Sequence, residues 1–368
     1  MSRYRVLVVD DAVVVRRIVS DVIGSDPELE VAGAAANGRI ALAKIPQVNP
    51  HVVTLDVEMP EMDGLQTLAA IRKEYPKLPV IMFSTLTARG ASATIEALSL
   101  GANDYVTKPA NVGKVTEAVQ CLREQLIPKL KLWCGRSEGF KSVAPRPLAS
   151  VNILAKLAAP KTVLLPRPVE VVAIGVSTGG PNALSALLAA LPGDFPVPIL
   201  IVQHMPPIFT RLLAERLSTQ TELKVKEGVA GEVVHAGHVY IAPGDYHMVV
   251  HRDGTAVRLG LHQEMPENSC RPAVDVLFRS VAEVYGAGTL AIVLTGMGQD
   301  GLRGCERIRE VGGQIMAQDE ASSVVWGMPG FVAKAGLADE VLPLTEIAPT
   351  MLRRIRRSRI ESHIRLRK

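Results

Sequence analysis

This sequence has few aromatic residues and no long apolar run. Of its 368 residues, 48% are hydrophobic but only 4% are aromatic, which predicts aliphatic cores. No apolar run approaches the roughly 20 residues that a membrane-spanning helix requires. The opening residues, MSRYRVLVVDD, reach two carboxylates at once and do not resemble a signal peptide. We therefore expect a cytoplasmic protein without a transmembrane segment.

Cysteine is scarce as well. The four cysteines are Cys121, Cys134, Cys270 and Cys305, and no two of them form a CxxC pair. In a chain of this length, such a pattern is typical of reduced thiols, and it argues against a disulfide framework or a structural zinc site. We therefore expect four free thiols.

Basic charge is distributed unevenly along the chain. The net charge is +4, yet residues 129–167 carry eight Lys or Arg against Glu138 alone, and residues 351–368 carry eight against Glu361 alone. Each segment thus has a charge of +7, which leaves −10 for the rest of the chain. Nucleic-acid binding needs a basic face on a folded element, so we expect no nucleic-acid partner. The basic segments are typical of solvated chain, and weak attraction to an anionic membrane or partner is the alternative.

The first 126 residues alternate short apolar runs with helical patterns. The runs that predict strands are Val6–Val9, Val31–Ala35, Val52–Leu55, Val80–Phe83 and Tyr105–Val106, and the helical patterns between and after them end at Leu126. Short, fully apolar strands that alternate with helices indicate a parallel sheet covered on both faces. We predict a doubly wound, five-stranded parallel α/β domain of the flavodoxin-like type, with its site at the carboxyl ends of the strands.

A second α/β pattern follows a proline-rich segment. Residues 127–168 contain six prolines with basic residues between them, which predicts an interdomain linker. Residues 169–357 form the second domain, and residues 358–368 a basic tail. The predicted strands are Val171–Val176, Ile199–Val202, Val239–Ile241, Leu290–Leu294 and Gln314–Ala317, with an antiparallel hairpin across Met248–Leu261. We expect a Rossmann-like, doubly wound α/β domain with a β-hairpin insertion.

Three acidic residues follow strands of the first domain. Asp10 and Asp11 come after RVLVV, and Asp56 comes after HVVTL. Clustered carboxylates favour a hard divalent cation, so we expect Mg²⁺ on these three residues, with Asp56 as the nucleophile toward a phosphoryl group. Lys108 follows the last strand and is placed to reach the same crevice. Ser84 ends the run PVIMFS and offers a hydroxyl to a phosphate oxygen.

The first 125 residues resemble the response-regulator receiver family. The matching residues are Asp10-Asp11, Asp56 with its following MPEMDG, Ser84 and Lys108-Pro109. The resemblance implies Mg²⁺-dependent phosphorylation of Asp56 by a partner histidine kinase. It also implies a two-state switch in which Ser84 moves to the phosphoryl group and Tyr105 follows.

The second domain carries a GxSxG motif at residues 175–179. An apolar strand precedes Ser177 and a helix follows Pro181, which suits a serine nucleophile at a sharp turn, although a glycine-rich phosphate-binding loop would look similar. His204 ends the next strand and is the candidate base. Asp300 follows a third strand and is the candidate orienting acid; Asp319 is its rival, but a capping role explains Asp319 better.

An oxyanion hole is expected near these side chains. The turn Gly296-Met297-Gly298 leaves backbone N–H groups free to bind a developing negative charge. The chain order is Ser, His, Asp, whereas α/β-hydrolases run Ser, Asp, His, so an ordinary lipase or esterase is disfavoured.

Six segments together resemble the catalytic domain of the chemotaxis protein-glutamate methylesterase family. They are GVSTGG, QHMPP, YIAPGDYH, RPAVDVLF, TGMGQDG and WGMPG. The resemblance places Ser177, His204 and Asp300 on the family's triad and Met297 at its oxyanion turn. It implies hydrolysis of glutamyl γ-methyl esters on the cytoplasmic helices of chemoreceptors, at receptor clusters, to glutamate and methanol, and also deamidation of glutamines. It implies no cofactor for the esterase.

The chain departs from that family at one position. The family has histidine before the Arg-Pro of RPAVDVLF, whereas this chain has Cys270. We further expect the unphosphorylated receiver to inhibit the hydrolase. The alternatives are a DNA-binding response regulator, which would need a basic recognition helix, and a non-catalytic interaction module.

Overall fold

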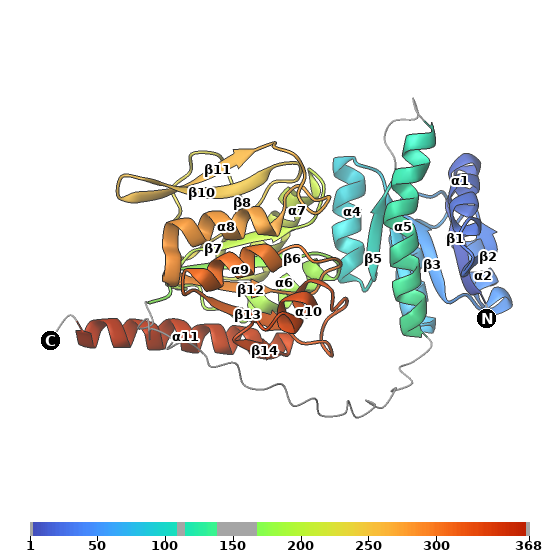
Figure 1. Ribbon diagram of the computed structural model, residues 1–368. Helices are drawn as coiled ribbons and strands as arrows, with labels where there is room; N and C mark the ends of the chain where they lie inside the picture. Colours follow the sequence, from blue (N-terminus) through green and yellow to red (C-terminus); the bar gives the residue numbers. More distant parts are fainter. Residues whose placement is uncertain (1–2, 109–114, 138–167, 366–368) are drawn as a thin grey trace, which may run out of the picture. The chain divides into compact units, whose positions relative to one another are not determined.

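The chain forms two α/β units, each on its own parallel sheet, in the computed structural model (Figure 1). The structure describes residues 3–108, 115–137 and 168–365. Within these ranges, no helix combines the length and the apolar character needed to cross a bilayer.

The first unit contains a five-stranded sheet in the order β2-β1-β3-β4-β5, as predicted. Its strands are β1 (Tyr4–Val9), β2 (Leu29–Ala35), β3 (Val52–Asp56), β4 (Val80–Ser84) and β5 (Asp104–Thr107). Its helices are α1 (Val13–Gly24), α2 (Gly38–Val48), α3 (Gly64–Glu74), α4 (Ala88–Ser99) and α5 (Val115–Ser137). Strand β1 pairs in parallel with both β2 and β3, and β3 pairs in parallel with β4.

Burial explains why the strands of this unit could be read from the sequence. Every residue of β3 and of β4 is buried, as expected for central strands of a sheet covered on both faces. Asp10 directly follows β1 and Asp56 ends the neighbouring β3. Their carboxylates therefore meet at one edge of the sheet.

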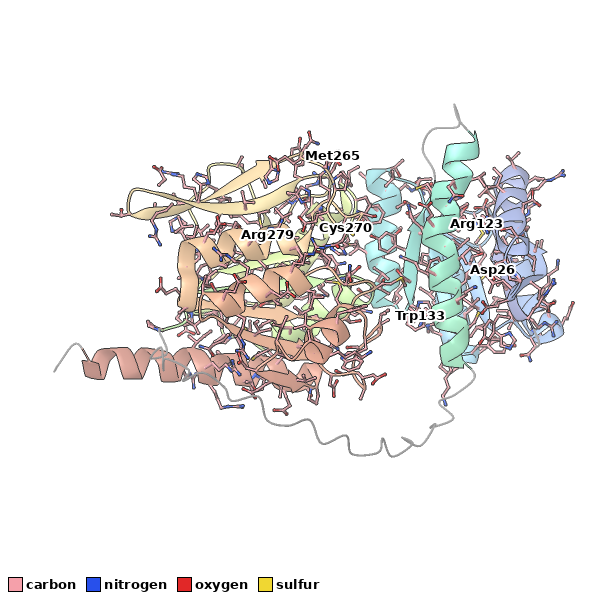
Figure 2. The ribbon with its side chains drawn as sticks, in the orientation of Figure 1. Asp26, Arg123, Trp133, Met265, Cys270 and Arg279 are labelled. Atoms are coloured by element: carbon pink, nitrogen blue, oxygen red, sulfur yellow. The ribbon has the colours of Figure 1, made fainter. Side chains whose placement is uncertain are left out.

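Helix α5 extends further than the sequence suggested. We placed the start of the linker at residue 127, but α5 continues to Ser137 and contains Pro128 within it. Leu126, Leu130 and Trp133 are buried along one side of the helix at spacings of four and three residues (Trp133 is labelled in Figure 2). The recurring prolines and basic residues predict a linker from residue 127, but this apolar stripe keeps the chain helical past Pro128. The rest of the predicted linker, residues 138–167, lies outside the described residues.

The second unit is larger than the five predicted strands imply. Its parallel sheet has seven strands in the order β14-β13-β12-β6-β7-β9-β8. These strands are β6 (Val171–Val176), β7 (Ile199–Gln203), β8 (Lys224–Glu227), β9 (His238–Ile241), β12 (Thr289–Val293), β13 (Gln314–Gln318) and β14 (Glu340–Leu342). The two strands missed, β8 and β14, are short edge strands with polar or exposed residues, so neither has a continuous apolar run.

Helices cover both faces of this sheet. They are α6 (Gly180–Ala189), α7 (Phe209–Gln220), α8 (Val274–Tyr285), α9 (Leu302–Glu310), α10 (Met328–Lys334) and α11 (Leu344–Arg365). Helices α8 and α9 pack on each other and on β12, whereas α6 packs with α7 and α11. Along β6, Val171 and Ala173 join the cluster that contains α8, and Val172 and Ile174, also buried, point to the opposite face. Helix α11 runs into the residues predicted as a tail.

The predicted hairpin is present as strands β10 (His247–Asp253) and β11 (Ala256–His262). They pair antiparallel from His247 opposite His262 to Asp253 opposite Ala256. Gly254 in the turn has a φ of 59°, a conformation that glycine adopts without strain. The hairpin packs on α8, where the Val250 N–H donates to Ser280 Oγ over 3.1 Å.

The strand order reverses at β6. From β6 the chain first builds outward through β7, and later returns to place β12 on the other side of β6. The carboxyl ends of these three adjacent strands thus open at a topological switch point, where ligands of open α/β sheets bind. Ser177 follows β6, His204 follows β7, and the segment from Leu294 to Asp300 follows β12.

Candidate active site

Ser177 stands on a sharp turn between β6 and α6. Its N–H donates to Thr295 O over 3.0 Å, and its carbonyl accepts from the Gly180 N–H over 2.8 Å. Gly179 has a φ of 80°, the left-handed conformation that the turn requires. The strand–turn–helix context expected for the GxSxG motif is therefore present, and the half-buried Ser177 side chain lies at the N-terminal end of α6.

His204 and Asp300 are joined by a hydrogen bond. His204 Nε2 lies 2.8 Å from Asp300 Oδ2, and the two side chains are 12% and 2% exposed. Four other N–H groups donate to the same carboxylate: the backbone N–H groups of Val274, Asp275 and Gly301 and the side-chain amide of Asn268. The carboxylate of Asp300 is thus held in place from several sides. Its rival Asp319 instead accepts from the N–H and Oγ of Ser322 in a local turn.

This arrangement shifts the pKa of both partners in opposite directions. Burial lowers the pKa of His204, but the hydrogen bonds with Asp300 and Cys270 outweigh burial and raise this pKa above its ordinary value. Burial raises the pKa of Asp300, but the hydrogen bond and charge of His204 prevail and lower it. The pair therefore favours an ionised carboxylate beside a protonated imidazole.

The second ring nitrogen of His204 faces Cys270. The distance from Cys270 Sγ to His204 Nδ1 is 3.6 Å. Among the described residues, no hydrogen bond joins Ser177 Oγ to the imidazole. Because Nε2 is engaged by Asp300, Nδ1 is the nitrogen left to take a proton from Ser177.

The turn after β12 packs directly against Ser177. A Cβ added to Gly296 would lie 2.9 Å from Ser177 Cβ and 2.3 Å from Met328 Sδ, so only glycine fits at this close approach. Met297 follows and is half-buried. In the part of the chain that the structure describes, no hydrogen bond uses the backbone N–H of Met297. That N–H is free to stabilise an oxyanion.

Sequence reasoning missed two groups that position these side chains. The amide of Gln203, which is 2% exposed, donates from Nε2 to the carbonyls of Ser177 and His204 over 3.0 and 3.3 Å. The amide of Asn268 bridges Asp300 and Asp275 over 3.0 and 2.9 Å. Gln203 stands in the quoted QHMPP segment and was within reach of the sequence. Asn268 lies in an irregular segment without any such signal.

The first unit brings together its predicted acidic site. One oxygen from each of Asp10, Asp11 and Asp56 lies within 4.8 Å of the others. Lys108 Nζ lies 2.8 Å from both Asp10 Oδ2 and Asp56 Oδ2. Burial, helped by the charge of Asp10 and opposed by Lys108, raises the pKa of Asp56 to about 6. Three carboxylates face one ammonium group, so this donor set suits a hard divalent cation.

The two predicted switch residues lie on adjacent strands. Ser84 is the last residue of β4 and its Oγ donates to Thr85 O over 3.2 Å. Tyr105 lies on β5, where its carbonyl accepts from Lys129 Nζ over 2.6 Å and its ring lies 5.1 Å from that ammonium group. Movement of either side chain stays a prediction.

Comparison with known proteins identifies both units. The family model described as CheB methylesterase matches residues 172–351, and the response regulator receiver domain model matches residues 6–120. A protein of Trichodesmium erythraeum, named protein-glutamate methylesterase/protein-glutamine glutaminase, is 55% identical across 96% of this chain and 100% of its own length. The chain belongs to the CheB methylesterase family.

Further matches agree with that family. A Nocardioides protein of the same name is 52% identical across 98% of this chain and 97% of its own. The crystal structure of the Thermotoga maritima CheB methylesterase catalytic domain matches with a TM-score of 0.50 and 44% identity, over 50% of this chain and 97% of that one. The chain is therefore a chemotaxis hydrolase of the protein-glutamate methylesterase and glutaminase type, with a receiver domain in front. This disfavours the DNA-binding and non-catalytic alternatives.

Proposed function

We propose that this protein is a phosphorylation-activated hydrolase of chemoreceptors. It demethylates glutamyl γ-methyl esters on their cytoplasmic helices to glutamate and methanol, and it deamidates glutamines there. The observation that carries this proposal is the 2.8 Å bond between His204 and Asp300 at the strand ends next to Ser177. We place the protein in the cytoplasm, at receptor clusters on the inner face of the membrane.

In the proposed mechanism Ser177 is the nucleophile. Its Oγ attacks the γ-carbonyl of the substrate while His204 takes the proton at Nδ1. Asp300 accepts the Nε2–H of the imidazole and stabilises the imidazolium that forms. The Met297 N–H donates to the oxyanion. His204 then protonates the leaving group as it departs from the tetrahedral intermediate. The leaving group is released as methanol from a methyl ester and as ammonia from a glutamine.

Water completes the reaction. His204 removes a proton from water, which attacks the acyl-serine; the bond from the acyl carbon to Oγ then breaks, His204 returns the proton to Oγ, and glutamate is released. Gln203 takes no part in the chemical steps. Its amide positions the backbone of Ser177 and His204 by donating to both carbonyls. These residues account for the whole acyl transfer, so we propose that the esterase needs no cofactor.

The receiver supplies control in this proposal. When Mg²⁺ is bound, it neutralises the carboxylates and orients the phosphoryl group. Asp10, Asp11 and Asp56 are placed to hold it, since their oxygens lie within 4.8 Å of one another. Asp56 accepts the phosphoryl group from a chemotaxis histidine kinase, and Lys108 lies beside it. Ser84 then moves toward the phosphoryl group and Tyr105 follows. This change relieves the inhibition by the unphosphorylated receiver.

Loss of the phosphorylation site should separate control from catalysis. Asp56→Asn is expected to keep basal methanol release from methylated receptor fragments but to lose all stimulation by a small phosphodonor with Mg²⁺. Asp63→Asn is the matched control, since Asp63 only caps helix α3. The measurement is methanol release with and without phosphodonor. Stimulation that persists in Asp56→Asn would sink the receiver half of the proposal.

The raised pKa of His204 predicts an alkaline activity profile. A general base must be neutral to accept a proton. Burial lowers the pKa of His204, but the contacts with Asp300 and Cys270 raise it more, so His204 stays protonated at pH values above its ordinary pKa. We therefore expect kcat/KM to keep rising with pH beyond about 7, where an unperturbed histidine with a pKa of about 6.5 would have levelled off. His251→Gln, at an exposed histidine, should leave the profile unchanged. A plateau already reached below neutral pH would contradict this expectation.

A further inference from the structure

The imidazole of His204 has a partner that the proposed mechanism does not use. Cys270 Sγ lies 3.6 Å from Nδ1, on the ring edge opposite the bond from Nε2 to Asp300. A thiol, an imidazole and a carboxylate thus stand in one hydrogen-bonded row beside Ser177. This order of groups is also found where a cysteine is activated for attack.

The backbone holds Cys270 in this place. The Cys270 N–H donates to Glu267 O over 2.9 Å and the Glu267 N–H donates to Cys270 O over 3.1 Å, which closes a tight turn. The Glu267 carboxylate is clamped by both terminal nitrogens of Arg279 on α8. Figure 2 labels Cys270 and Arg279 within the second unit. The thiol is therefore positioned by a built turn and is still only half-buried, so a small reagent can reach it.

The other cysteines lack this setting. Cys134 and Cys305 are buried, and burial raises the pKa of the Cys305 thiol well above its ordinary value. Cys121 is exposed on α5, where its sulfur accepts from the amide of Gln125 over 3.2 Å. Among the described residues, only Cys270 combines access from solvent with a histidine at hydrogen-bond distance.

We propose that Cys270 is a redox modification site, and that its oxidation by hydrogen peroxide switches the esterase off. The switching half rests on the proposed function, whereas the thiol chemistry does not. The thiolate is the form that attacks peroxides, and an adjacent imidazolium favours such reactivity. His204 provides that imidazolium, since Asp300 holds it at Nε2.

The reaction balances with the groups present and one peroxide. The Cys270 thiolate attacks one oxygen of hydrogen peroxide; the S–O bond forms and the O–O bond breaks. The sulfur loses two electrons and becomes a sulfenic acid, while the departing hydroxide takes the Nδ1 proton of His204 and leaves as water. The product is Cys–SOH beside a neutral imidazole.

The sulfenic acid would block catalysis at one atom. Nδ1 must take the proton of Ser177, and the new S–OH group, on a sulfur that lies 3.6 Å from that nitrogen, is placed to donate a hydrogen bond to it. Nε2 of the imidazole is then bound to the Asp300 carboxylate, and the lone pair of Nδ1 accepts from the sulfenic acid, so neither nitrogen can take the proton of Ser177. Since a sulfenic acid is reducible by thiols, the block is reversible.

The test treats the full chain with hydrogen peroxide and traps sulfenic acids with dimedone. Mass spectrometry then reads labelling at each cysteine. We expect Cys270 to be labelled about tenfold faster than the exposed Cys121, and His204→Gln to remove that advantage. Ser177→Ala should keep it, because the serine takes no part in the reaction. Equal labelling of Cys121 and Cys270, or no effect of His204→Gln, overturns the modification site.

Methanol release tests the switch separately. Peroxide is expected to remove at least about nine-tenths of the activity of the native chain, and a thiol reductant should restore it, whereas methionine oxidation would not be reversed by thiols. Each variant is compared with its own untreated sample. Cys270→Ala should resist peroxide, while Cys121→Ala should stay sensitive. Loss of activity in Cys270→Ala to the same extent overturns the switch. Absence of methanol from the untreated native chain would instead refute the proposed function and leave the labelling result to decide on the thiol.

Discussion

Replacing Ser177 by alanine is expected to lower kcat for methyl-ester hydrolysis by about 10⁵-fold or more, the effect seen when a triad nucleophile is removed. The loss comes from chemistry alone, because the hydrogen bonds that Ser177 makes with the described residues all use its backbone. Its N–H donates to Thr295 O, and its carbonyl accepts from Gly180 and Gln203. The variant should therefore fold normally and still bind methylated receptor fragments.

Ser185→Ala provides the matched control for that experiment. Ser185 lies on α6, the helix that follows Ser177, and its Oγ donates to Gln220 over 2.7 Å. It should keep native kcat. The readouts are methanol release under saturating substrate and the thermal unfolding midpoint of each variant. If Ser177→Ala kept activity within about tenfold of the native chain, Ser177 would be excluded as the nucleophile. Removal of a triad nucleophile lowers kcat far more than that.

The positions of these residues at strand ends were predictable because parallel strands buried on both faces are continuous apolar runs. Val171–Val176 and Ile199–Val202 are clear apolar runs in the sequence, so Ser177 and His204, which follow them, are predicted to lie at the carboxyl edge of the sheet. Asp300 needed one more inference, because six residues of irregular turn separate it from the end of β12. The five strands of the receiver followed from the same rule.

The features of the site that could not be predicted from the sequence depend on contacts between residues far apart in the chain. Cys270 and His204 are 66 positions apart, and Asn268 and Asp300 are 32 apart, so no local pattern relates them. Edge strands such as β8 escaped for a different reason, since their exposed polar residues carry no apolar periodicity. Local chemistry thus predicts where a strand ends, but only the fold decides which side chains meet there.

Asp300→Asn carries the second large effect, with an expected fall in kcat of about 10⁴-fold, as for a triad acid changed to its amide. The carboxylate accepts from His204 Nε2, so once the imidazole is neutral its remaining proton is on Nε2, and Nδ1 is free for the proton of Ser177. An amide can present its own N–H to Nε2 and reverse this tautomer. Nδ1 then carries the proton and can no longer act as a base.

The same substitution should also lower the stability of the fold, because the Asp300 carboxylate binds backbone N–H groups as well as His204. The backbone N–H groups of Val274, Asp275 and Gly301 all donate to this carboxylate, and an amide has only one oxygen to accept them. We expect a loss of about 1–3 kcal/mol in unfolding free energy, because buried donors are left unpaired. Asp319→Asn is the matched control: within the described residues, the carboxylate of that rival acid accepts only from Ser322 in its own turn, so the variant should keep native kcat. A native kcat in Asp300→Asn, with the loss appearing in Asp319→Asn instead, would move the orienting acid from the strand β12 edge to that of β13.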